Sequence, residues 1–477
     1  INQYFFEMAN IREHCSWVHS KEKEHATQKA KDIVRMSVAR AAHLEPLQEF
    51  QLPVNKTALV VGGGLAGMTS ALNMAEQGVE VHLIERDSDL GGMARRIHTT
   101  LEGMDVQAHL SQLIKKVYRH PRVRVATDSS IVDVAGYVGN FVTKVKTEGR
   151  LREIPHGIAI LATGAQEHRP TEYLYGSDQR VLTSLELEGE IQQQSERVLG
   201  ARSLVMIQCV GCRQLDRNYC SRVCCGQSIK NALKLKALNP ALEISILFRD
   251  IRSYGFKEDY YREAANKDVK FIRFVPEAKP LVAAAGGGLK VTVADPVLGQ
   301  MLELEADLVV LAAAVVPNES GRELARLFKA SLNPDGFFQE AHVKLRPVDF
   351  AADGVFLCGT AQYPKHISET ISQAYGAAGR AITILSGDSV TASGAVCDVN
   401  EHDCVACGAC ITACTYGAIE FYDTPQGKKA RVEAVLCKGD GLCNAKCPTG
   451  AIYLKHYTDD EIFAQIDQAV APKGKAH

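Results

Sequence analysis

The cysteines of this chain lie in three tight groups. Twelve of the fifteen fall at residues 209–225, 404–414 and 437–447. Thiolates gathered in this way bind soft metal ions and iron–sulfur clusters, whereas the disulfide-stapled secreted domains that also concentrate cysteine are small. In a long chain with no visible signal peptide, the grouping predicts metal or cluster ligation in a reducing cytoplasm.

Two of the groups repeat one spacing. Residues 404–414 read C-x2-C-x2-C-x3-C, which gives three thiolates to one [4Fe-4S] cluster and the fourth to its neighbour. Residues 437–447 keep this spacing with Asp440 in the second ligand position. The pattern predicts one cluster on four cysteines and a second on three, with Asp440 or water on the fourth iron. The two sets are Cys404, Cys407, Cys410 and Cys447, and Cys414, Cys437 and Cys443.

A structural zinc site fits these runs less well, because zinc takes four ligands from two C-x2-C pairs rather than from two interlocked runs. Asp440 leaves two alternatives open. Its carboxylate either ligates iron or leaves a labile corner at which the cluster converts to [3Fe-4S]. We favour a ligated but oxidation-sensitive [4Fe-4S] cluster whose reduction potential the hard oxygen donor changes.

The third group lies in residues 208–225, here called the thiol loop, between a strand-like and a helix-like run. Doubly wound folds ordinarily place nucleotide-binding glycines there. The residues leave three kinds of site open: a redox-active disulfide of Cys209 and Cys212, a zinc site, or an iron–sulfur cluster of unusual spacing. Because the segment from about 201 to 316 has no G-x-G-x-x-G, NAD(P)H binding there is not expected.

Residues 62–67, G-G-G-L-A-G, fit the dinucleotide-binding fingerprint. Gly62 makes the tight turn, Gly64 lets the backbone approach a pyrophosphate, and Gly67 lets helix and strand pack closely. The motif follows a strand-like run and opens a helix-like run. Glu85 ends the next strand, where a carboxylate binds ribose hydroxyls. Together these features predict a dinucleotide site.

The segments after Glu85 favour FAD over NAD. RDSDLGGMAR (86–95) resembles the E-x5-G-G extension of two-dinucleotide-domain flavoproteins, and LATGA (161–165) and VFLCGTA (355–361) resemble two later FAD-contacting segments of that superfamily. The superfamily usually has Asp where this chain has Thr360, which leaves the ribityl contact open. The further residues so assigned to the cofactor are Arg86, Gly91, Gly92, Met93, Thr163, Gly164, Gly359 and Thr360.

Strand-like and helix-like runs alternate through the middle of the chain, which indicates doubly wound α/β domains with parallel sheets. The apolar spacing predicts helices within residues 1–50, ending before Pro46, and over 105–120 and 257–268. Residues 121–150 are expected to form hairpins. A capping box from Thr458 to Glu461 is expected to open a final helix.

Composition bounds the function classes. At 477 residues the chain is expected to form two or three domains. Its 54 basic and 56 acidic residues give no electrostatic footprint for nucleic acid. The apolar runs are far shorter than the ~20 residues that span a bilayer. Since residue 1 is not Met, we expect the numbering to begin inside a gene product or in a processed or split subunit.

Over nearly its whole length the chain resembles the flavin-containing A-type subunit of heterodisulfide reductase, a family of methanogens and many anaerobic bacteria. The resemblance rests on NIREHCSWVH (10–19), the FAD fingerprint, QCVG…YCSRVCC in the thiol loop, and the C-terminal cysteine runs. It implies an α/β, two-dinucleotide-domain, thioredoxin-reductase-like flavoprotein with a C-terminal two-cluster ferredoxin-like domain and a short N-terminal helical segment.

The resemblance also implies domain bounds. The expected domains are a helical remnant of an iron–sulfur domain (1–50), the first part of an FAD domain (51–200), an inserted NAD-domain-like segment (201–316), the return of the FAD domain (317–392), a ferredoxin domain (393–456), and a C-terminal helix and tail (457–477).

In this family the inserted domain carries a non-standard [4Fe-4S] site. Matched residue by residue, its ligands are Cys209, Cys220, Cys224 and Cys225. Cys212 departs from the family pattern and is expected to be a bystander. Cys15 matches a ligand of a further cluster whose other cysteines lie upstream, and a buried structural cysteine is the alternative. Three clusters are therefore expected, with a further one shared through Cys15.

The resemblance implies flavin-based electron bifurcation, in which FAD splits electron pairs between ferredoxin and a higher-potential acceptor. The implied partners are other subunits of such a complex, a hydrogenase or formate dehydrogenase linker subunit, ferredoxin, and a second copy in a homodimer; the expected location is cytoplasmic. Lys365 and His366 follow the flavin segment and are candidates to act on the isoalloxazine, although both also suit a helix start. Two alternatives stay open: a non-bifurcating electron-transfer subunit of a sulfate-reduction-type complex, and an NAD(P)H-dependent disulfide reductase.

Overall fold

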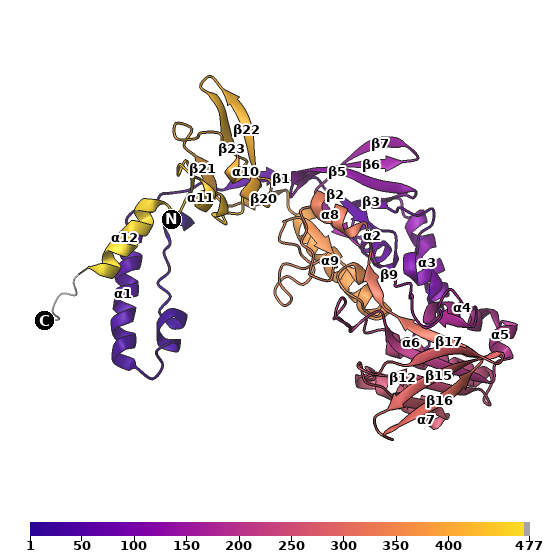
Figure 1. Cartoon of the computed structure of the whole chain (residues 1–477). Helices are drawn as coiled ribbons and strands as arrows, with labels where there is room; N and C mark the ends of the chain where they lie inside the picture. Colours follow the sequence, from indigo (N-terminus) through magenta and orange to yellow (C-terminus); the bar gives the residue numbers. More distant parts are fainter. Residues whose placement is uncertain (472–477) are drawn as a thin grey trace. The chain divides into compact units, whose positions relative to one another are not determined.

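The computed structural model describes residues 1–471 as two compact units. One is the continuous segment Val54–Asp388, and the other joins Ile1–Pro53 to the chain from Ser389 onward. The residues assigned to FAD and the thiol loop lie in the first unit, and those of the C-terminal cysteine runs lie in the second (Figure 1). The tail expected at 472–477 lies outside the described residues.

The first parallel sheet of the Val54–Asp388 unit has the strand order β19-β8-β2-β3-β4. Its central strands are covered on both faces, so they read in the sequence as continuous apolar runs. Helices α2 and α9 pack against each other beside this sheet. The bounds are β2 Thr57–Val61, β3 Glu80–Ile84, β4 Val123–Ala126, β8 Ile158–Leu161, β19 Val355–Leu357, α2 Leu65–Glu76, α3 Val106–Arg119 and α9 Ile367–Leu385.

The second parallel sheet has the order β10-β17-β11-β12-β13 and is formed by the inserted segment. The thiol loop joins the end of β11 to the start of α6, where a doubly wound fold binds its ligand. The bounds are β10 Val181–Thr183, β11 Ser203–Val210, β12 Glu243–Phe248, β13 Val269–Arg273, β17 Leu308–Ala313, α4 Ser184–Gln193, α5 Glu196–Leu199, α6 Cys224–Leu238 and α7 Glu258–Asn266.

Two antiparallel three-stranded sheets and one strand pair complete this unit. The prediction of hairpins over 121–150 was right for β5 and β6 but wrong for β4, which pairs in parallel with β3 at the sheet edge. A short apolar run does not reveal its partner strand. The bounds are β5 Ser129–Tyr137, β6 Asn140–Thr147, β7 Arg150–His156, β14 Leu281–Ala285, β15 Gly288–Asp295, β16 Gln300–Ala306, β9 Ala165–Glu167 with β18 Val315–Pro317, and α8 Gly321–Leu327.

The second unit holds a small, cysteine-dense domain and a pair of packed helices. Helix α1 packs against α12, which begins with the predicted capping box of Thr458 and Glu461 (Figure 1). The bounds are α1 Lys23–Ala41, β1 Phe50–Pro53 with β20 Ser389–Ala392, β21 Cys397–Val399 with β24 Ile452–Leu454, β22 Ile419–Thr424 with β23 Gly427–Val432, α10 Ala409–Ala413, α11 Leu442–Lys446 and α12 Asp459–Val470.

Residues 1–50 are less helical than predicted. Besides α1 they form a single turn at Gln3–Phe5 and a short π-helix at Arg12–Trp17. The first segment lacks a continuous apolar face, and Pro46 favours the extended backbone that leads into β1. Within residues 1–471 no helix is long and apolar enough to cross a membrane.

Candidate functional site

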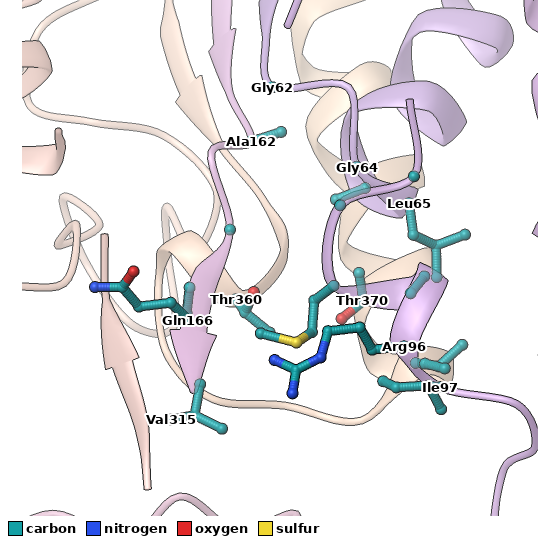
Figure 2. A pocket seen from close by; sticks show the side chains of 18 of the residues that line it. Gly62, Gly64, Leu65, Arg96, Ile97, Ala162, Gln166, Val315, Thr360 and Thr370 are labelled. Atoms are coloured by element: carbon teal, nitrogen blue, oxygen red, sulfur yellow. The ribbon is translucent and has the colours of Figure 1, made fainter. Parts of the chain in front are cut away.

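A cavity of about 970 Å³ lies within the Val54–Asp388 unit, at the carboxyl ends of the parallel strands. Its walls come from the β2–α2 turn, the end of β3, the loop after β8, and the turn before α9 (Figure 2). Val315 and Thr360, which are far apart in the sequence, both line it. The volume and the convergence of several loops are typical of a large cofactor site.

The glycines of the fingerprint have the roles that a dinucleotide site requires. A Cβ on Gly62 would lie 2.4 Å from the carbonyl oxygen of Ala162, and one on Gly67 would lie 1.8 Å from that of Gly62. Both positions therefore require glycine for close packing. Gly64 differs, because a Cβ there would meet nothing within 4 Å, and Gly64 lines the cavity. This open backbone before the first turn of α2 fits a pyrophosphate.

Glu85 is buried at the end of β3 and lines the cavity. Its carboxylate accepts hydrogen bonds from the backbone N–H of Gly63 at 2.6 Å and of Asp87 at 3.0 Å. The carboxylate thus fixes both loops, and its remaining acceptor capacity suits ribose hydroxyls. The residues present fit FAD.

Ten of the twelve residues predicted to bind the cofactor line the cavity. The exceptions are Gly67 and Gly359; a Cβ on Gly359 would lie 2.7 Å from Ala66 Cβ, so this glycine also serves close packing. The ten are Gly62, Gly64, Glu85, Arg86, Gly91, Gly92, Met93, Thr163, Gly164 and Thr360.

The inserted segment supplies a wall of the cavity that was not predicted from the sequence. Val223, Gly226 and Lys230 of the α6 start line the cavity, as does Ala313 at the end of β17. Lys230 is buried, forms an ion pair with Glu188 at 2.7 Å, and donates to the carbonyl of Thr99 at 2.9 Å. No local motif marks these residues, because their place depends on how two sheets pack.

Lys365 and His366 both line the cavity. Lys365 Nζ donates to the carbonyl oxygens of Gly359 at 2.5 Å and Tyr363 at 3.0 Å, and to Gln362 Oε1 at 3.2 Å. These acceptors occupy its three donors, so Lys365 acts on a bound ligand through charge. Burial lowers the pKa of Lys365 to about 8.

His366 begins α9, and its backbone N–H donates to Glu369 at 2.8 Å. Burial lowers the pKa of its imidazole. Glu369 in turn pairs with Arg222 of the thiol loop at 2.7 Å, and Arg222 also donates to the carbonyl of Pro364 at 3.4 Å. The start of α9 and the thiol loop are therefore tied together beside the cavity.

The cysteines of the thiol loop gather at the carboxyl edge of the second sheet. Cys209 lies near the end of β11, Cys224 donates to the carbonyl of Ala313 at 3.9 Å, and Cys225 donates to that of Asp250 at 4.0 Å. Beside Cys220, a Tyr219 hydroxyl and a Ser221 hydroxyl both bond to the backbone of Val315, and Val315 lines the cavity. These two bonds are Tyr219 Oη to Val315 O at 2.8 Å and Val315 N to Ser221 Oγ at 2.9 Å.

Cys209 has a left-handed backbone, with φ of 63°. This conformation costs a non-glycine residue about 1–2 kcal/mol and often marks a functional site. The hydrogen bond with Cys212, together with Arg213 and Arg249, lowers the pKa of Cys209 to about 6. The same bond and burial raise the pKa of Cys212. Cys209 is thus prepared as a thiolate and Cys212 as its proton-bearing neighbour.

Burial raises the pKa of Cys225 to about 11 and that of Cys224 well above its ordinary value. Vicinal buried thiols at the start of a helix become thiolates when a metal binds them, because coordination displaces the proton. Within residues 1–471 no group of three or more His, Cys, Asp or Glu is arranged for a single metal ion. The four ligands of a cubane bind four different irons, so this donor set fits a cluster.

The C-terminal cysteines also fit clusters. Cys404, Cys407, Cys410 and Cys447 line one small cavity. Backbone N–H groups point at the sulfurs, from Ala430 to Cys404 at 3.5 Å and from Ala418 to Cys414 at 3.4 Å. Such hydrogen bonds stabilise ligating thiolates.

Two predicted ligands remain proposals on different grounds. Asp440 is exposed, and its Oδ1 accepts the backbone N–H of Leu442 at 3.2 Å. Cys407 holds the corresponding position in the first run and is exposed as well. Cys15 is buried in the short π-helix and donates to the carbonyl of Ala26 at 2.7 Å, which is also what a structural cysteine does.

Comparison with known proteins decides the family. A pyridine nucleotide-disulphide oxidoreductase family matches residues 56–207, and a 4Fe-4S dicluster domain matches residues 403–451. An A-type iron–sulfur subunit of the CoB–CoM heterodisulfide reductase of Methanopyrus kandleri, the second of two from that organism, is 35% identical over 89% of this chain and 78% of that protein. The chain belongs to the family of heterodisulfide reductase A-type subunits.

Another relative, the A-type subunit of the H2:CoB–CoM heterodisulfide,ferredoxin reductase of Methanothermobacter marburgensis, is 33% identical over 98% of this chain and 84% of its own length. Thioredoxin reductase of Lactococcus lactis matches 70% of this chain with a TM-score of 0.49 at 16% identity. As a member of the heterodisulfide reductase family, the chain is an iron–sulfur flavoprotein and an oxidoreductase. The predicted fold class and family are confirmed.

Gly64→Ala and Gly67→Ala separate cofactor binding from folding. Gly64→Ala should weaken FAD binding at least about tenfold and leave the unfolding free energy within about 0.5 kcal/mol, because its Cβ occupies the cofactor's space. Gly67→Ala should destabilise the apoprotein by about 1–3 kcal/mol through overpacking. FAD titration and denaturant unfolding measure both effects. Full FAD affinity in Gly64→Ala would contradict this account.

Lys365 should make the flavin potential depend on pH. Above pH 8 the amine is neutral in the oxidised protein and takes up a proton when anionic reduced flavin forms. The two-electron potential should therefore fall by about 30 mV more per pH unit above pH 8 than below it. Lys365→Met should lose this extra slope, whereas Lys365→Arg should lose the slope but keep the potential measured at pH 7. Unchanged potentials in Lys365→Met would exclude the role.

Cysteine variants test the ligand set proposed for the thiol loop. Cys220→Ser should lose up to about four iron atoms per chain, one cluster's worth, while Cys212→Ser should keep its iron. Iron and acid-labile sulfide analysis of anaerobically purified protein measures this difference. If Cys212→Ser loses as much iron as Cys220→Ser, Cys212 is a ligand.

Proposed function

We propose that the chain is the FAD- and cluster-bearing electron-transfer subunit of a heterodisulfide-reductase-like complex. In this role it splits electron pairs at FAD between ferredoxin and a higher-potential acceptor that partner subunits reach. The name of the Methanothermobacter marburgensis relative pairs heterodisulfide with ferredoxin, and this supports ferredoxin as one acceptor.

The observation that carries the proposal is the shared wall between the FAD cavity and the thiol loop. Val223 lines the cavity and directly precedes Cys224 and Cys225 in the chain. Ala313 lines it too and accepts from Cys224. A nicotinamide-dependent reductase binds its nucleotide over glycines at this strand–helix turn. Here thiols take that place, so the neighbour of the flavin is a metal-binding group.

When bound, FAD takes up two electrons together and passes them on one at a time. The chain's own residues shape that chemistry. Gly64 and Glu85 hold the nucleotide end, and the Lys365 charge favours electron density on the reacting ring. Tyr219 and Ser221 fix the thiol loop against the cavity wall through Val315.

The proposed cluster inventory is one cluster on the thiol loop and two on the C-terminal runs, with a further one shared through Cys15 and other cysteines. The proposed partners are the remaining subunits of the complex, a hydrogenase or formate dehydrogenase linker subunit, and a second copy of this chain in a cytoplasmic assembly. The dicluster match at residues 403–451 supports the two C-terminal clusters.

One observation favours a second candidate, an NAD(P)H-dependent disulfide reductase. The hydrogen bond between Cys209 and Cys212 lowers the pKa of one thiol and raises that of the other, as in a dithiol redox pair. The missing glycine loop speaks against nucleotide binding beside that pair. A non-bifurcating electron-transfer subunit differs from the main proposal in its flavin potentials.

Anaerobic titration distinguishes the three functions. We expect excess NADH or NADPH to leave the flavin oxidised, and potentiometry to show a first one-electron flavin potential below the second. Bleaching by a nicotinamide nucleotide would favour the disulfide reductase. Ordinary, uncrossed flavin potentials would favour simple electron transfer. Partner subunits that co-purify with the tagged chain identify donor and acceptor.

A further inference from the structure

Cys397 lies against the second C-terminal cysteine set, although the ferredoxin spacing does not include it. It is the first residue of β21, it is 3% exposed, and its Sγ lies 3.4 Å from Cys443 Sγ. Its backbone N–H donates to Cys437 Sγ at 3.4 Å. Cys397 therefore contacts two of the three thiolates assigned to this cluster.

The internal symmetry of the domain shows that this thiol is specific to one site. Each position of the first run recurs 33 residues later, as Cys404 and Cys437 do. By the same offset Cys397 corresponds to Ala430, whose backbone N–H donates to Cys404 Sγ at 3.5 Å. The backbone contact is thus the same at both sites, but the side chain differs.

The side chain varies together with the ligand set. The site with four cysteine ligands has Ala430 at the strand position, and the site with Asp440 has Cys397 there. Asp440 and its counterpart Cys407 are both exposed, so the iron that they bind faces solvent. Cys397 is buried on the opposite, inner side. It does not replace the missing ligand at the exposed corner.

The contact with Cys443 defines what Cys397 does. Thiolates on different irons of a cubane point away from one another, whereas a sulfur 3.4 Å from a ligand sulfur is at hydrogen-bonding distance. Iron displaces the protons of Cys437 and Cys443. The proton in the contact then belongs to Cys397, which donates it. Hydrogen bonds to ligand sulfurs are among the factors that set cluster potentials, because they offset negative charge on the reduced cluster.

We propose that Cys397 donates its S–H to the ligand sulfurs of the cluster on Cys414, Cys437 and Cys443, and thereby raises the reduction potential of that cluster. Cys397 is a positioning residue for electron transfer and not a ligand. Its hydrogen bond opposes the negative charge that the Asp440 carboxylate adds to the same cluster. The inference rests on the two-cluster assignment proposed above for residues 404–447.

The test is an anaerobic redox titration of the full chain, monitored by electron paramagnetic resonance, after iron and sulfide analysis. Cys397→Val keeps the bulk of the side chain and removes the donor. It should lower the potential of one cluster by about 59 mV, which is a tenfold change in its reduced-to-oxidised ratio. Cys397→Ser keeps a donor and should restore most of this loss. Ala430→Cys, the matched variant at the other site, should raise a different potential.

Three results would overturn the proposal. In a wild-type chain with two C-terminal clusters, an unchanged potential in Cys397→Val refutes the hydrogen bond alone. Loss of iron or a new [3Fe-4S] signal in Cys397→Val makes Cys397 a ligand. A wild-type chain with a single C-terminal cluster refutes the two-cluster assignment and this inference with it.

Discussion

Parallel strands deliver their carboxyl ends to one edge of a sheet, and the chemistry of the Val54–Asp388 unit depends on this constraint. The first sheet places Glu85 and the glycine turn at its edge, and the second sheet places the thiol loop at its own. The two edges meet at one cavity, where Ala313 at the end of β17 both lines the wall and accepts from Cys224. A flavin and a thiol-bound group are thereby held as neighbours without any dedicated linker.

Local motifs predicted a large part of this arrangement. Gly62, Gly64 and Glu85 were placed from spacing alone, because turn geometry and pyrophosphate approach require particular residue types at particular positions. The wall of Val223 and Lys230 was not predictable from the sequence, because it arises when α6 packs beside a cavity formed elsewhere. The wrong prediction for β4 has a similar cause, since hydrophobic spacing identifies a strand but not its partner.

The spare cysteines form a second theme. Cys212 and Cys397 both fall outside the expected ligand sets, and from the sequence they are assigned to the core or treated as departures. In the structure each is buried and contacts the sulfur of an expected ligand, Cys209 and Cys443 respectively. Spacing rules find ligands because ligation fixes spacing, whereas a hydrogen-bonding thiol on a distant strand leaves no such trace. Its role emerges only when the fold brings the strand to the site.

The central claim is that an iron–sulfur cluster takes the place of a nicotinamide nucleotide beside the flavin. Anomalous diffraction at the iron absorption edge, from crystals grown without oxygen, tests it most directly. The account predicts an iron-specific peak enclosed by the sulfurs of Cys209, Cys220, Cys224 and Cys225, with FAD density in the adjacent cavity. Absence of iron there, with a Cys209–Cys212 disulfide or a zinc ion instead, would contradict it.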